Sequence, residues 1–378
     1  LQDGAPINLA DDNGDFQELE PIFFDHLEVY RGANALRFGS GTLGGAINGV
    51  TPTGDNAHGV YARLDAGSYA MVRGLVSAGF GDERLNGWAA PSADSHQGDR
   101  DHANRDSLRF HGNIGVRLAD AISTRFHVSA NRLDQQLPGA LTTAVARSKP
   151  KTGNFAGDQA RDITSLRLQN RTRFDWGATR LDIGVFANWK DLYHPIFQVI
   201  DQNSTDYGGF ARLEHEAGPL SFTLGGEIRR GSTRARQYVN VNGKRGALLL
   251  DADQDARTAN LYAEARFRPI AGVTLIAGGI HADGWRQRRV DFSATPTQDG
   301  RIAFDAFSPR FGVLVEPAPD IQLFANYSRS AEFPGFGEVF QTVSGVSTFI
   351  GSIRPQRAWT AEIGTRGKAG WLSWDVTA

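Results

Sequence analysis

Residues Leu181–Lys190 have the sequence LDIGVFANWK. Leu, Ile, Val, Ala and Trp occupy its odd-numbered positions, and Asp, Gly, Phe, Asn and Lys occupy the even ones. A period of two is typical of a β-strand, and about ten residues are what a tilted strand needs to cross a bilayer. Similar alternation recurs in residues 165–176, 258–268 and 359–366. From His58 onward, the sequence therefore predicts repeated amphipathic strands.

Composition excludes several classes of protein. No stretch approaches the roughly 18 consecutive apolar residues of a membrane helix, whereas membrane strands stay possible because alternation dilutes their apolar residues. The formal net charge of −2 argues against a nucleic-acid partner held by bulk positive charge. Cysteine is absent, which excludes a disulfide framework, a thiolate metal site and a cysteine nucleophile.

Short turns and long polar loops alternate along the predicted strands. The short turns lie near residues 81–83, 119–121, 177–178, 217–219, 269–272, 317–320 and 368–370, and the long loops near 93–105, 134–161, 191–205, 231–256, 285–302 and 329–355. Outer-membrane barrels have short periplasmic turns and long extracellular loops, whereas a β-sandwich has no reason to sort its loops in this way. We therefore predict an all-β transmembrane barrel built as an antiparallel meander.

The two faces of the predicted strands differ in polarity. One face is apolar, with Trp and Phe toward the strand ends, and suits lipid; the other carries Arg, Asp, Glu and Asn and suits a wet, wide lumen. We count about fifteen strands, an odd number, and the last run, Trp371–Ala378, stops inside a strand. Because bacterial single-chain barrels have even counts and a bilayer does not tolerate an open sheet edge, we expect truncation at the C-terminus.

The first 57 residues follow another pattern. Ile22–Tyr30 (IFFDHLEVY) is a short strand candidate, and Arg31–Gly54 contains seven glycines, which mark tight turns and close backbone approach. This part of the chain is typical of a small, loop-rich globular unit. The chain starts at Leu1 without a basic-then-apolar leader, so we expect a fragment that begins within a domain.

Leu27–Thr51 (LEVYRGANALRFGSGTLGGAINGVT) resembles the end of the plug domain in TonB-dependent outer-membrane receptors. Its order is a short strand, Arg-Gly, small residues, an aromatic-Gly-Ser, then Gly-Gly-Ala-Ile-Asn and Thr. Weaker family-like stretches are Leu137–Leu141, Asn326–Ser330 and Arg354–Gly367. The resemblance implies that residues 1–57 are the C-terminal part of an α+β plug and that residues 58–378 are an incomplete barrel of roughly 22 strands.

The same resemblance implies active transport across the Gram-negative outer membrane. Family members bind a scarce extracellular ligand, most often a ferric siderophore, and import it to the periplasm with energy transmitted by the TonB complex, whose contact segment would be missing here. Haem, cobalamin and glycan receptors share the scaffold, so the ligand stays open. A passive porin-like channel and an outer-membrane lipase or protease are further alternatives, although the sequence offers only dispersed catalytic candidates and no cofactor motif.

An ion pair between plug and barrel is one candidate site. In the family, plug arginines pair with glutamates of the barrel wall, which would hold the plug in place. Arg31 follows the predicted plug strand, and Glu362 lies in the matching barrel stretch on the predicted lumen face. We therefore expect an Arg31–Glu362 pair, with Glu227 and Glu264 as other acceptors; alternatively, Arg31 is a solvated turn residue.

Candidate ligand contacts lie on the predicted outward loops. Tyr193, His194 and Phe197 would offer aromatic contacts, and Arg234 and Arg236 would attract an anionic ferric complex or the phosphates of lipopolysaccharide. The same aromatics could instead pack against neighbouring loops or sit at the membrane interface. His96 and His102, with nearby aspartates, form one local cluster that suits a solvated loop better than a metal site.

Overall fold

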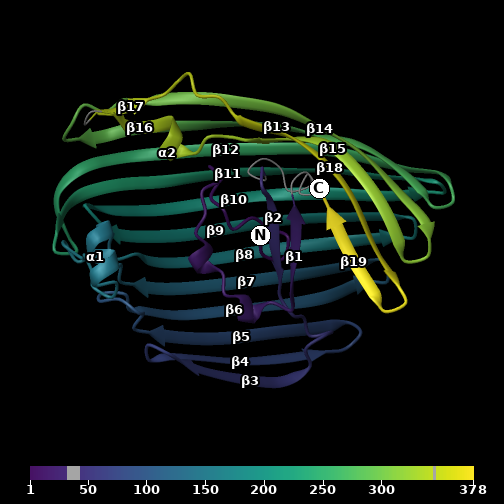
Figure 1. Cartoon of the computed structure of the whole chain (residues 1–378), viewed down its shortest axis with the longest axis horizontal. Helices are drawn as coiled ribbons and strands as arrows, with labels where there is room; N and C mark the ends of the chain where they lie inside the picture. The colour runs from purple at the N-terminus through teal and green to yellow at the C-terminus, as the bar shows by residue number, and fades with distance from the viewer. Residues whose placement is uncertain (32–42, 344–345) are drawn as a thin grey trace.

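The computed structural model describes residues 1–31, 43–343 and 346–378. Its main feature is an antiparallel sheet of 15 strands, in which neighbours in sequence are neighbours in the sheet (Figure 1). The order of the strands is a meander, as the sequence predicts. The strands are β3 (Gly59–Gly67), β4 (Met71–Gly81), β5 (Leu85–His96), β6 (Arg105–Ala119), β7 (Ile122–Gln135), β8 (Asp162–Trp176), β9 (Thr179–Pro195), β10 (Gln198–Ala217), β11 (Leu220–Val241), β12 (Lys244–Ile270), β13 (Val273–Ser293), β14 (Gly300–Ala318), β15 (Ile321–Glu332), β18 (Gln356–Ala369) and β19 (Leu372–Thr377).

One end of the sheet, the short-turn end, carries the predicted tight turns. The opposite long-loop end carries the helix α1 (Thr143–Ser148) between β7 and β8. It also carries an excursion between β15 and β18 with the helix α2 (Phe336–Val339) and a hairpin of β16 (Phe340–Val343) and β17 (Val346–Phe349). Figure 1 shows these elements together at the left end of the strands. Within the described part of the chain, no helix is long and apolar enough to span a membrane.

Two of the predicted long loops are wrong. Residues 191–205 and 231–256 are strand for nearly their whole length, since β9 and β10 are separated by two residues and β11 turns into β12 at Asn242–Gly243. Both turn residues have positive φ, 49° and 79°, as a two-residue hairpin turn with a matching twist requires. Residues 285–302 are likewise strand except at 294–299. These hairpins extend past the apolar band, where both faces mix polar residues with apolar ones such as Leu192 and Val199, and the alternation that marks a membrane strand disappears.

The large sheet buries polar side chains and exposes apolar ones. Along β9, Asp182, Asn188 and Lys190 are buried, whereas Ile183 and Val185 on the other face are exposed. A soluble protein would place these groups the other way round. We call the face that carries Ile183 and Val185 the outer face; its apolar side chains are those that lipid would cover.

The described N-terminal residues 1–31 and 43–57, here named the inner segment, lie against the opposite, inner face. They contain two 3₁₀ turns, Phe16–Glu18 and Pro21–Phe23. They also contain the antiparallel pair β1 (His26–Arg31) and β2 (Gly45–Val50), and Figure 1 shows this pair crossing in front of the large sheet. Side chains from each of the ten consecutive strands β4 to β13 contact the inner segment. One short segment can meet ten strands only because the sheet curves around it.

Replacing Val185 with Arg tests the assignment of the outer face. Val185 is 57% exposed on β9, and a charge near the middle of a bilayer should lower the free energy of unfolding by about 2–4 kcal/mol. The control is Val239→Arg, since Val239 is 41% exposed close to the β11–β12 turn and should change stability by about 0.5 kcal/mol or less. The measurement is reversible urea unfolding in phospholipid bilayers. Equal losses in the two variants would contradict the lipid-facing assignment.

Candidate functional site

The inner segment is strongly acidic. Residues 1–57 contain nine Asp and Glu and only two Arg. The inner face of the sheet is correspondingly basic where the two meet, so the contact between them is an interface of opposite charges. The individual contacts follow the segment from its long-loop end to its short-turn end.

The residues closest to the long-loop end form a tight loop, Leu9–Asn13. The Leu9 N–H donates to the Asn13 carbonyl at 2.8 Å, and Asp12 takes a positive φ of 70° to close the loop. Asp12 Oδ1 accepts from Arg229 Nη2 of β11 at 2.6 Å, and its Oδ2 lies 3.4 Å from Arg286 Nη2 of β13. This carboxylate therefore joins two buried guanidinium groups of the sheet wall.

The backbone beside this loop is fixed by two neighbouring strands. The Ala10 N–H donates to Asp206 of β10 at 2.6 Å, and the Ala10 carbonyl accepts from the Thr258 hydroxyl of β12 at 3.0 Å. The backbone N–H and C=O of Ala10 are thus both paired with side chains of the sheet, as buried backbone requires. The loop is held by backbone contacts as well as by charge.

The middle of the inner segment is held by four ion pairs with three cationic side chains. Asp15 accepts from Arg161 at 2.6 Å and from Lys190 Nζ at 2.5 Å. Glu18 lies 2.7 Å from Lys190 Nζ and also contacts Arg167, and its side chain is only 1% exposed. Lys190 of β9 is therefore shared between Asp15 and Glu18. Because Glu18 also contacts Arg167 of β8, this network fixes the segment relative to both strands.

At residues 20–23, the contacts of the inner segment change from ion pairs to apolar packing. Glu20 pairs with Arg73 of β4 at 3.2 Å. Phe23 is fully buried against Leu75 and Trp88, and its ring centroid lies 4.1 Å from that of His111. Burying a phenylalanine contributes about 1.5–3 kcal/mol, so this packing is an apolar anchor beside the ion pairs.

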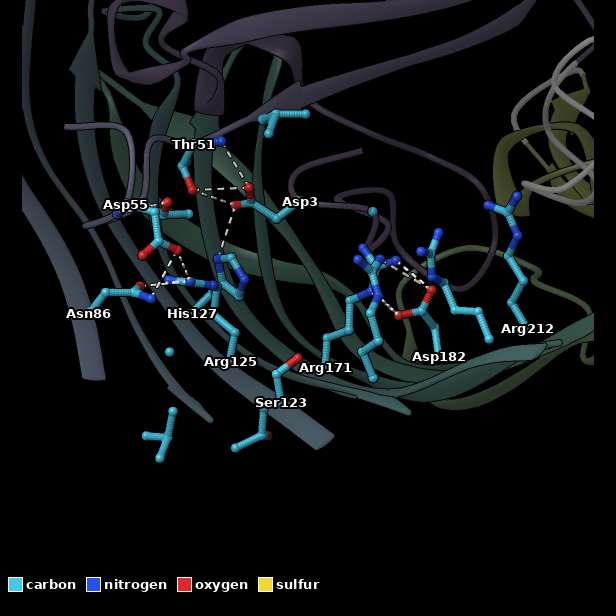
Figure 2. Close-up of a pocket in the computed structure, with 18 of the residues that line it drawn as sticks. Asp3, Thr51, Asp55, Asn86, Ser123, Arg125, His127, Arg171, Asp182 and Arg212 are labelled. Carbon is cyan, nitrogen blue, oxygen red and sulfur yellow. Dashed lines mark hydrogen bonds and ion pairs between the residues drawn. The ribbon is translucent and has the colours of Figure 1, made fainter. Parts of the chain in front are cut away.

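A cavity of about 860 Å³ lies between the inner segment and the short-turn end of the sheet. Figure 2 shows Asp3 between Thr51 and His127 at its edge; Asp3 accepts from the Thr51 backbone at 2.8 Å and lies 3.3 Å from His127 Nδ1. On the opposite wall, Arg171 reaches Asp182 at 2.8 Å. The polar lining of the cavity suits a water-filled space.

A second cavity, of about 420 Å³, lies on the other side of the segment. It is bounded by Asp11–Asn13 and by the excursion between β15 and β18, at residues 332–338, 353–354 and 356. The Phe336 N–H, at the start of α2, donates to Asp11 Oδ2 at 3.3 Å and so ties the excursion to the segment. The inner segment thus lies between one cavity at each end of the sheet.

The structure does not test the predicted pair between Arg31 and Glu362. The side chain of Arg31 lies outside the described residues, and Glu362 accepts from Asn326 at 2.5 Å. The other two acceptors that we considered, Glu227 and Glu264, pair with Arg229 at 2.9 Å and Arg310 at 3.0 Å, both on the sheet. The Arg31–Glu362 pair stays a prediction. In the ion pairs that join the described part of the inner segment to the sheet, the acid lies on the segment and the base on the sheet, the reverse of the predicted pair.

The predicted ligand contacts are divided between two faces. His194 points to the inner face and approaches the Ala160 carbonyl at 2.6 Å. Tyr193, Arg234 and Arg236 point to the outer face of their hairpins, and Phe197 is 83% exposed at the β9–β10 turn. Their role in ligand binding stays a prediction.

Arg234 and Arg236 already have anionic or polar partners. Arg234 pairs with Asp251 at 2.6 Å, Asp253 at 2.9 Å and Asp291 at 2.5 Å. Arg236 reaches Asp201 at 3.4 Å and also contacts Asn203. An incoming anion would have to compete with these carboxylates.

His96 and His102 do not form a metal centre with their neighbours. His102 Nε2 lies 2.9 Å from the Gln159 carbonyl, and its ring stacks on Phe155. No group of three or more His, Cys, Asp or Glu residues suited to a metal ion occurs among residues 1–31, 43–343 and 346–378. The charged interface described above was the feature that sequence reasoning missed; the excess of nine acids over two arginines was its available signal.

Comparison with known proteins gives one family and several similar folds. A family model described as TonB dependent receptor-like, beta-barrel matches residues 30–378. Among solved structures, the unliganded ferric citrate transporter FecA aligns with a TM-score of 0.80 at 16% identity, covering 98% of this chain and 59% of that one. The copper transporter OprC aligns with a TM-score of 0.81 at 14% identity, covering 100% of this chain and 62% of that one. The ferric-catecholate import receptor Fiu from Escherichia coli K12 aligns with a TM-score of 0.76 at 16% identity, covering 98% of this chain and 65% of that one.

The chain spans about three fifths of the length of these solved transporters and receptors. A search of curated protein sequences found no match.

Replacing Glu18 with Gln should loosen the inner segment. The substitution keeps the size of the side chain but leaves Lys190 and Arg167 with less compensating charge in a buried site, where removing one partner of an ion pair costs about 3–5 kcal/mol. We expect faster chymotrypsin cleavage within residues 1–24 of the full-length protein, where Phe16 and Leu19 flank the substituted position. The control is Asp25→Asn, since Asp25 is about half exposed and its ion-pair partner among the described residues is the exposed His26. Unchanged protection in Glu18→Gln would contradict a role of this pair in holding the segment.

The contribution of the Asp15 ion pairs to the free energy of unfolding should depend on pH. Burial raises the pKa of Asp15, but Lys190 and Arg161 outweigh burial and hold the pKa below its usual value. A lowered pKa stabilises the folded state at pH above roughly 4, and this contribution is lost as pH falls through the folded-state pKa. The difference in unfolding free energy between the wild type and Asp15→Asn should be constant above pH 5 and shrink below about pH 4.

Asp11 supplies the matched control for this measurement. Burial raises the pKa of Asp11, so its charged form opposes folding and the wild type should gain stability relative to Asp11→Asn as the pH falls. A difference for Asp15→Asn that does not change between pH 7 and pH 3 would contradict the ion-pair assignment.

Proposed function

Because the chain belongs to the TonB-dependent receptor-like β-barrel family, we propose that this protein is an outer-membrane receptor that imports a scarce extracellular ligand to the periplasm. Energy for import would be transmitted by the TonB complex, and the inner segment would be part of the plug. The ligand class that we favour is a ferric siderophore. Receptor function, rather than enzymatic activity, is consistent with the family.

The observation that carries this proposal is the charged interface around the inner segment. The segment occupies the space enclosed by ten strands and separates the two cavities. A passive channel gains nothing from such an obstruction, whereas a receptor must keep a wide lumen closed until its ligand is bound.

The type of contact also suits a plug that must move. The desolvation penalty of a buried ion pair offsets much of its Coulomb energy, and water readmitted from either cavity would solvate the separated charges. An interface of ion pairs is therefore specific in geometry but costs less to separate than an apolar interface of equal area. A mechanical pull on the segment could release it without unfolding the sheet.

The ferric siderophore is favoured over other ligands by two of the similar structures, which are described as a ferric citrate transporter and a ferric-catecholate import receptor. Another is described as a copper transporter, and haem, cobalamin and glycans are further alternatives. The contacts that we propose for the ligand stay Tyr193, His194, Phe197, Arg234 and Arg236 on the long-loop side. The Arg31–Glu362 pair would add a further contact between plug and barrel.

Uptake by the full-length receptor tests this proposal. The receptor is expressed in cells that lack their own siderophore receptors, and accumulation of iron-55 is measured with a panel of ferric siderophores, with and without TonB. We expect saturable uptake of at least one complex, abolished when TonB is absent. Uptake that persists without TonB would overturn active transport in favour of a passive channel. Parallel uptake measurements with haem, cobalamin and glycans test the other ligand classes.

A further inference from the structure

Two arginines flank a tryptophan on the outer face near the long-loop end of β15 and β18. Arg329 lies opposite Trp359 in the register of these strands, and Arg357 precedes Trp359 by two residues on the same face. The guanidinium of Arg329 is 5.6 Å from the ring of Trp359, and the ring of Tyr327 stacks on that of Trp359 at 5.1 Å. We call Tyr327, Arg329, Arg357 and Trp359 the outer arginine patch.

Alternation assigns the patch to the outer face. Ser328, between Tyr327 and Arg329, is 1% exposed, whereas Trp359 is 54% exposed. Farther from the long-loop end, the same face carries the exposed apolar residues Leu323 and Ile363. The patch therefore lies at the edge of the apolar band, at the level where aromatic side chains of membrane proteins meet lipid headgroups.

The charge of the patch is not neutralised by the protein. Neither Arg329 nor Arg357 has a carboxylate within 4 Å among the residues that the structure describes, and no Asp or Glu occupies the outer face of β15 or β18. Two other arginines on the outer face are paired: Arg132 lies 3.1 Å from Asp134, and Arg257 lies 2.7 Å from Asp283. Arg301, on the same face, lies over the ring of Trp285 at 4.5 Å and, like the patch, has no carboxylate within 4 Å among the described residues. The unpaired arginines at this membrane level indicate an anion supplied from outside the chain.

From this arrangement we infer that the outer arginine patch binds a phosphorylated lipid of the outward-facing leaflet. Guanidinium groups recognise phosphate oxygens in a bidentate geometry, and the Trp359 and Tyr327 rings would lie beside the upper part of the acyl chains. The inference rests on the outer-membrane location in the proposed function, but it concerns the surface of the barrel and not the transport route.

Binding of lipid A to the full-length, detergent-purified receptor tests the patch. Native mass spectrometry counts retained lipid during titration with diphosphoryl lipid A and with the same lipid after removal of its phosphates. We expect the wild type to retain the phosphorylated lipid and the Arg329→Gln/Arg357→Gln variant to bind it at least tenfold more weakly. Arg329→Lys, which keeps the charge, should recover part of the binding, and inorganic phosphate at millimolar concentration should not displace the lipid.

The matched control is Arg132→Gln, which removes an outer-face arginine that already has a carboxylate partner and should leave lipid binding unchanged. Equal binding by the wild type and the double variant, or equal binding of the dephosphorylated lipid, would overturn the inference. Iron-55 uptake distinguishes the two proposals. We expect uptake by the double variant to match that of the wild type, so that loss of lipid binding with normal uptake supports the patch. Absence of uptake in the wild type would contradict the proposed function and not the patch.

Discussion

The ion pairs between the acidic inner segment and the basic inner face of the sheet are the constraint on which the rest of the architecture depends. Asp12, Asp15, Glu18 and Glu20 bring guanidinium and ammonium groups from strands β4, β8, β9, β11 and β13 and from Arg161, just before β8, to one short stretch of chain. Without these carboxylates, the inner face would carry many like charges close together, and mutual repulsion would oppose the curvature that brings them there. The segment therefore fills the lumen and also balances the charge of the wall.

The same arrangement would combine tight closure with movement of the segment, as the proposed function requires. Phe23 and its apolar neighbours hold the segment at one end, and the buried Ala10 peptide is satisfied by Asp206 and Thr258 at the other. Between them, the contacts are charged, and Asp12 borders the second cavity. An interface built in this way discriminates strongly against a shifted register, because a displaced carboxylate would leave a buried cation unpaired.

The sheet has two regimes along its height. Near the short-turn end, its outer face is apolar, as Val185 and Leu261 show, and its inner face is polar. Toward the long-loop end, β9 to β13 continue as hairpins whose two faces both carry polar residues, with Arg234 neutralised by three aspartates. The outer arginine patch lies at the boundary between these regimes, where its charges have no carboxylate partner among the described residues.

The sequence alone determined the strand architecture, because the period of two, the tight turns and the glycine-rich stretch before His58 are local features. The predicted count of about fifteen strands and the predicted positions of the short turns are confirmed. It could not determine that residues 191–205 and 231–256 are hairpins, since apolar and polar residues are mixed on both faces there and the alternation is lost. Nor could it pair Asp12 with Arg229, 217 residues away. Only the curvature of the sheet decides which distant charges meet, and that curvature arises from the sum of all strand pairings.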